Sequence, residues 1–125
     1  MPRATNDITA TTRLELKSCP EGYVVLRRMT YGQYLKRQAM AMEMKMQVDS
    51  DKSKSKTVDM IGGQEKVTAF EFGICIAEHN LEDENGTLLD FKREAHVQLL
   101  DSRIGLEIGD LIDAQTQYQD EQSGN

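Results

Sequence analysis

TYGQYLKRQAMAMEMKM, residues 30–46, is the stretch that decides how this chain folds. Thr30 and Gln33 have the spacing of a capping box, in which the two side chains satisfy backbone N–H groups at the start of a helix. Met29 and Tyr34 have the spacing of a hydrophobic staple around the same start. We therefore predict a helix that begins at Thr30 and carries the methionines that follow.

More than half of the seven methionines in the chain alternate along this predicted helix, as Met40, Met42, Met44 and Met46. Methionine is flexible and polarizable, and surfaces that grip varied apolar segments use it heavily. Residues two positions apart lie about 200° apart around a helix. We therefore expect Met42 and Met46 to fill the core and Met40 and Met44 to face a partner, with core filling by more of the run as the alternative.

The apolar stripe on the core side of this helix is predicted to join Tyr31 and Leu35 to Met42 and Met46. Adding the two outer methionines makes the apolar surface too wide for one core contact, which favours a partner on the remaining side. The candidate partner-binding residues are Tyr34, Met40, Met42, Met44 and Met46.

Around this helix the sequence predicts a β-hairpin and further helices. Residues 13–17 and 23–27 have strand patterns on either side of a Pro–Gly turn, which is typical of a hairpin. Residues 67–78 fit a strand and a helix equally by periodicity; the length through His79 favours a helix, which Gly73 weakens. A short helix near 93–100 is expected next.

The last predicted helix is capped by Asp101 or Ser102 and carries Ile104, Ile108, Leu111 and Ile112 on one face. Gly105 and Gly109 on it have the spacing of a close helix packing motif.

At 125 residues the chain is expected to form one domain with a modest core. We predict an α+β fold, with an N-terminal β-hairpin packed on a small, mainly α-helical bundle at residues 11–114. Residues 1–10 are expected to be loose, the Lys/Ser-rich residues 49–57 to form a flexible loop, and the polar residues 115–125 to be a disordered tail.

Charge is divided between the two parts of the chain. Residues 1–57 hold eleven Lys/Arg against six Asp/Glu, and residues 58–125 hold four against fifteen, within a net charge of −6. The acidic second part argues against nucleic acid as a partner, because phosphate contacts need clustered cations. No stretch approaches the roughly 18–20 apolar residues of a membrane span, and no membrane partner is expected.

Enzyme chemistry is not expected. Cys75 and His79 would share a helix face as a nucleophile pair does, but an orienting carboxylate is missing and the apolar run favours a packed thiol. Zinc could in principle use these two residues with Cys19 and His96, yet structural zinc sites usually show two close pairs. We therefore predict a reduced, non-enzymatic protein without metal or cofactor.

Three segments together resemble the tail assembly chaperones of long-tailed (siphovirus-type) bacteriophages: residues 23–35 (YVVLRRMTYGQYL), residues 79–91 (HNL through LLDF) and residues 100–108 (LDSRIGLEI). The resemblance spans roughly residues 13–114. Many members of that family carry Pro in the Leu-Asp-x-Arg turn, where this chain has Ser102.

The resemblance implies a non-enzymatic assembly factor of the host cytoplasm. Such proteins bind the tape-measure protein, keep it soluble and help recruit the tail-tube protein; self-association is compatible with this role. The family is often made in two lengths by a ribosomal frameshift, and this chain resembles the short product. The alternative is a small structural virion protein, a head–tail or tail-completion component. A third option is an adaptor whose acidic half docks a basic partner.

Overall fold

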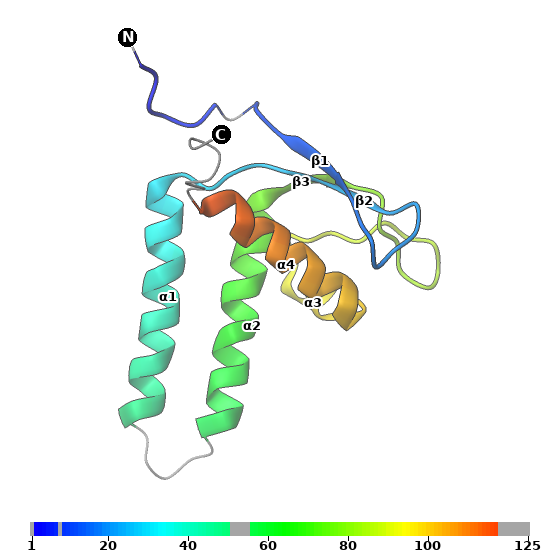
Figure 1. Cartoon of the computed structure of the whole chain (residues 1–125). Coiled ribbons are helices and arrows are strands. Elements are labelled where there is room, and N and C mark those ends of the chain that lie inside the picture. The colour runs from blue at the N-terminus through cyan, green and yellow to red at the C-terminus, as the bar shows by residue number, and fades with distance from the viewer. Residues whose placement is uncertain (1, 8, 51–55, 118–125) are drawn as a thin grey trace.

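The computed structural model describes residues 2–7, 9–50 and 56–117, and among their side chains it leaves out those of residues 44–50 and 56–63. In this part of the chain, three strands and four helices follow one another in the order β1-β2-α1-α2-β3-α3-α4 (Figure 1). The predicted α+β fold is therefore confirmed. Among the described helices, none has the length and apolar content that crossing a bilayer requires.

The strands form one antiparallel sheet with β2 in the middle. β1 (Thr12–Glu15) pairs with β2 (Tyr23–Leu26), which confirms the predicted hairpin. β3 (Ile76–His79) pairs with the other side of β2 and had not been predicted as a separate strand. At the hairpin turn a Cβ on Gly22 would lie 2.9 Å from the Cys19 sulfur and 3.0 Å from the Cys19 carbonyl oxygen, so a larger residue would crowd the turn.

The ambiguous segment 67–78 contains both structures. α2 (Lys56–Cys75) ends where β3 begins, so the predicted continuation of the helix to His79 is wrong. The Arg27 backbone N–H donates to the Cys75 carbonyl at 2.8 Å. Carbonyls in the last turn of a helix lack partners within the helix, and this contact from the end of β2 supplies one.

The predicted loop at 49–57 is shorter than expected. α1 (Tyr31–Ser50) continues through Ser50 and α2 starts at Lys56, so only residues 51–55 separate the helices, and these lie outside the described residues. Figure 1 shows α1 and α2 side by side and antiparallel, extending away from the sheet.

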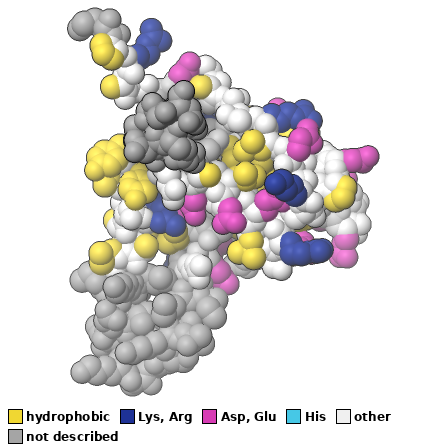
Figure 2. All heavy atoms as spheres, in the orientation of Figure 1, with side chains coloured by type: hydrophobic (Ala, Val, Ile, Leu, Met, Phe, Trp, Pro, Cys, Tyr) yellow, Lys and Arg dark blue, Asp and Glu magenta, His cyan; other side chains and the backbone are white. Residues whose placement is uncertain are grey.

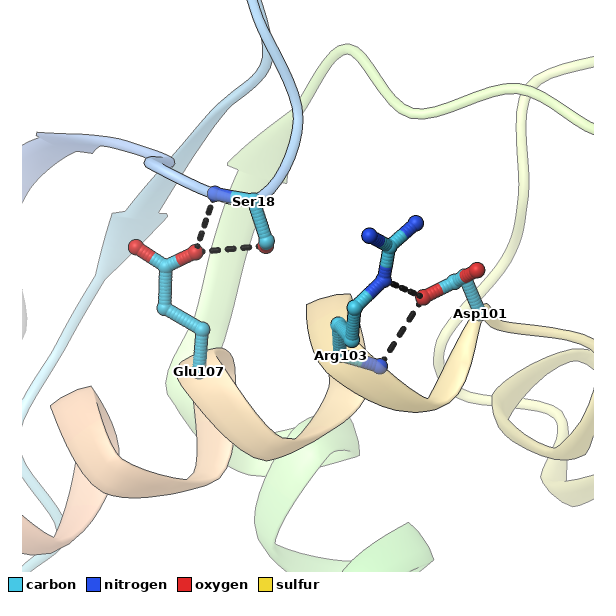
Figure 3. Close-up of polar contacts among 4 residues, drawn as sticks. All are labelled: Ser18, Asp101, Arg103 and Glu107. Carbon is cyan, nitrogen blue, oxygen red and sulfur yellow. Dashed lines mark hydrogen bonds and ion pairs between the residues drawn. The ribbon is translucent and has the colours of Figure 1, made fainter.

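The predicted short and final helices are present as α3 (Glu94–Gln98) and α4 (Ser102–Thr116). Asp101 is the N-cap of α4, and its carboxylate accepts from the Arg103 backbone N–H at 2.9 Å (Figure 3). A Cβ placed on Gly105 or Gly109 would meet nothing within 4 Å, so the predicted close packing at these glycines is wrong. Of the predicted polar tail, residues 118–125 lie outside the described residues.

The hydrophobic core lies where three elements meet: the sheet, helix α4 and the last turns of α2. Phe72 of α2 packs edge-on against Phe91 with ring centroids 5.9 Å apart. None of the described α1 side chains belongs to this cluster. The buried cluster consists of Leu16, Val24, Leu26, Phe72, Cys75, Ile76, Leu81, Leu89, Phe91, Ile108 and Ile112.

A carboxylate on α4 fixes the hairpin turn to the rest of the fold. Glu107 accepts from the Lys17 backbone N–H at 2.8 Å. It also accepts from the Ser18 backbone N–H at 2.9 Å and from the Ser18 hydroxyl at 2.5 Å (Figure 3). These hydrogen bonds, the hydroxyl first, lower the pKa of Glu107. The β1–β2 turn is therefore bound to α4 through a charged acceptor.

Candidate partner-binding surface

The first turn of α1 is capped as the sequence predicts. The Gln33 backbone N–H donates to the Thr30 hydroxyl oxygen at 3.1 Å, and the Thr30 backbone N–H donates to the Gln33 side-chain oxygen at 2.9 Å. This reciprocal pair is a capping box. It fixes the residue at which the helix starts.

Two basic side chains of α1 contact α2 on the inner face of α1. Arg37 Nε is hydrogen-bonded to a carboxylate oxygen of Glu71, which is buried in α2. The Lys36 ammonium lies 5.5 Å from the centre of the Phe70 ring, within the range of a cation–π contact. A buried carboxylate is costly without a partner, so the need to pair Glu71 turns the Arg37 side of α1 toward α2.

The outer face of α1 carries an exposed apolar stripe made of Tyr31, Leu35 and Met42, which we call the outer stripe. These side chains are 75%, 48% and 58% exposed, respectively. Their spacings of four and seven residues place them on one side of the helix. The Tyr31 ring stacks on that of Tyr34 with centroids 6.5 Å apart. Figure 2 shows hydrophobic side chains at this outer edge of α1.

The predicted core position of Met42 is wrong, because this side chain is 58% exposed. Met40, expected to face a partner, is half-buried, and its contact with a partner stays a prediction. Tyr34 is half-buried. The side chains of Met44 and Met46 lie outside those described, so their placement stays a prediction.

Sequence reasoning assigned Tyr31 and Leu35 to the core, although both are exposed on the outer stripe. One signal could have corrected this assignment. Glu71 interrupts an apolar run between Phe70 and Phe72. A carboxylate within such a run needs a cation from a neighbouring element, and Arg37 is a basic residue on the preceding helix.

Three residues considered for catalysis or metal binding, Cys75, His79 and His96, are packed or hydrogen-bonded within the fold. Cys75 is buried as predicted, and burial, followed by the charge of Glu71, raises its thiol pKa to about 12. Nδ1 of His79 accepts from the Leu81 backbone N–H at 3.0 Å, and burial lowers the pKa of this imidazole. Nδ1 of His96 accepts from the Asp90 N–H at 2.9 Å. Within the described residues, no three His, Cys, Asp or Glu side chains form a cluster suited to a metal ion.

Comparison of the chain with protein-family models, with curated proteins and with solved structures gave no match.

Proposed function

We propose that this protein is a tail assembly chaperone of the kind made by long-tailed bacteriophages, which binds the tape-measure protein in the host cytoplasm and keeps it soluble during tail assembly. The observation that carries the proposal is the outer stripe of α1, whose three large apolar side chains are exposed. The resemblance of residues 23–35, 79–91 and 100–108 to that family supports it independently. The tail-tube protein is a second proposed partner.

An exposed stripe on a fixed helix suits a long helical client. A second helix can lay its own apolar side chains against Tyr31, Leu35 and Met42, as in helix-in-groove recognition. The capping box and the Arg37–Glu71 pair already hold α1 in place, so presenting the stripe requires little further ordering.

The strength expected of this contact suits a chaperone. Complete burial of a large apolar side chain contributes about 1.5–3 kcal/mol, and micromolar affinity requires about 8 kcal/mol after association costs. Three side chains that are already part-buried in the free protein supply less than that. One chain is therefore expected to bind one client segment weakly and to release it when the tail assembles.

The test is co-expression of the tape-measure protein with this chain, followed by measurement of the soluble fraction of the client. The double substitution Leu35→Ser and Met42→Ser should return the client to the insoluble fraction. A matched control, Leu88→Ser with Leu106→Ser, changes two side chains that are 55% and 70% exposed elsewhere, and should leave the client soluble.

Two outcomes would contradict the proposal. One is that the client stays soluble when it is made with the Leu35→Ser, Met42→Ser variant. The other is that the control variant lowers the soluble fraction of the client by as much as this variant does. Detection of the chain in purified virions by mass spectrometry would favour the alternative role as a structural virion component.

A further inference from the structure

A hollow surface lies on the side of the molecule away from α1. It has a volume of about 810 Å³ and lies between the β1–β2 turn, the segment after β3 and the α3–α4 junction. In Figure 1 these segments lie at the opposite end of the sheet from α1. We call this hollow the acidic groove, for the side chains at its rim.

The floor of the acidic groove is apolar. Leu81 and Leu89 are buried beneath it, and Leu100 and Ile104 are half-buried in its wall. Leu99, in contrast, is 67% exposed in the lining. A leucine exposed beside an apolar hollow offers contact area to an incoming apolar side chain.

The charged side chains at the rim of the groove are all acidic. Five carboxylates line the groove, and among the described residues no Lys, Arg or His does so. Asp101 is paired with Arg103 at 3.3 Å, and the Asp83 carboxylate accepts backbone N–H groups of its own turn. The five rim residues are Glu21, Glu82, Asp83, Glu84 and Asp101.

The walls of the groove are fixed before anything binds. The Asn80 side chain accepts from the Tyr23 backbone N–H at 2.9 Å and donates to the Glu21 carbonyl at 2.9 Å, which joins the segment after β3 to the hairpin turn. Glu107 binds the same turn to α4 through Ser18. A groove held on both sides loses little entropy when it is occupied.

We propose that the acidic groove docks a basic segment of a partner protein, in which Lys or Arg side chains flank one or two large apolar ones. The apolar side chains would lie on Leu81 and Leu89 against Leu99, and the cations would face Glu82 and Glu84 at the rim. A nucleic acid would be repelled by this rim. The contact is separate from the outer stripe and does not rest on the proposed chaperone role.

Binding of a short fluorescein-labelled peptide of alternating lysine and leucine to the full-length protein, followed by fluorescence polarisation, tests this proposal. We expect saturable binding that weakens with added salt, because exposed charges are screened. The same peptide with glutamate in place of lysine should not bind. Amide NMR shifts caused by the peptide should cluster at Leu81, Leu89 and Leu100.

Two variants test the groove separately. Glu82→Lys with Glu84→Lys should weaken the peptide about tenfold through charge repulsion at the rim. Leu99→Ser should also weaken it, whereas the control Leu106→Ser, which lies outside the lining, should not.

Three results would overturn the proposal. The first is that the peptide binds the Glu82→Lys, Glu84→Lys variant as tightly as it binds the unsubstituted protein. The second is that the amide NMR shifts caused by the peptide centre on α1. The third is that the protein associates with itself in sedimentation experiments and that these two substitutions abolish the association. The last result would assign the groove to a second copy of the chain.

Discussion

α1 and α4 both carry an apolar stripe, yet the two helices place it differently. The α4 stripe, with Ile108 and Ile112, is buried against the sheet and α2, whereas the α1 stripe, with Leu35 and Met42, is exposed. α2 meets the core with Phe72 and Cys75, but it meets α1 with the buried Glu71. In the described part of the chain, α1 is joined to α2 by the Arg37–Glu71 ion pair and the Lys36–Phe70 contact, and its apolar stripe stays exposed.

The largest effect expected from this contrast is in the core. Phe72→Ala should lower the free energy of unfolding by about 3–5 kcal/mol, because it removes a fully buried ring and leaves a cavity beside Phe91. Urea denaturation measures this loss. A change below about 1 kcal/mol would mean that the core lies elsewhere.

Arg37→Ala is expected to cause the second-largest loss in the free energy of unfolding. It leaves the Glu71 carboxylate buried without its cation, and should cost about 2 kcal/mol, less than a fully buried pair because Arg37 is part-exposed. The double variant Arg37→Met with Glu71→Met restores apolar contact between α1 and α2, and should recover most of the loss. If the double variant is no more stable than Arg37→Ala, the claim that this pair orients α1 is wrong.

Glu107→Gln should have a smaller effect that depends on pH. The folded-state pKa of Glu107 lies below its ordinary value of 4.5, so its contribution is present above that value and is lost as the pH falls through the folded pKa. At pH 7 we expect a loss of about 1 kcal/mol, since the group is near the surface. The difference from the unsubstituted protein in urea denaturation should shrink as the pH falls below 4.5; a constant difference would show that packing is responsible.

The smallest effect on folding is expected at the outer stripe. Leu35→Ser with Met42→Ser should change the free energy of unfolding by less than about 0.5 kcal/mol per site, because both side chains are already exposed. Thermal and urea denaturation measure this directly. A loss close to that of Phe72→Ala would place these residues in the core.

Local signals predicted much of the fold. The Thr30–Gln33 capping box, the Asp101 cap and the hairpin around Gly22 each depend on a few neighbouring residues, and the structure contains all three. β3 was missed because its pairing partner β2 lies about fifty residues earlier, and its own pattern follows a helix without a break.

The side of α1 that faces α2 could not be read from its apolar pattern. That pattern identifies a stripe but does not say what covers it. Here the orientation depends on the contact between Arg37 and Glu71, thirty-four residues apart. The acidic groove could not be predicted from local sequence patterns either, because its walls come from three separate segments of the chain.

The most direct test of the central claim, that the outer stripe of α1 binds the client, is site-specific photo-crosslinking in cells that also make the tape-measure protein. A photoreactive amino acid would replace Leu35 in one variant and the control Leu106 in another, both exposed in the free protein. We predict a crosslink to the tape-measure protein from position 35 and none from position 106. Equal crosslinking from both positions, or a soluble client that crosslinks only from position 106, would contradict the claim.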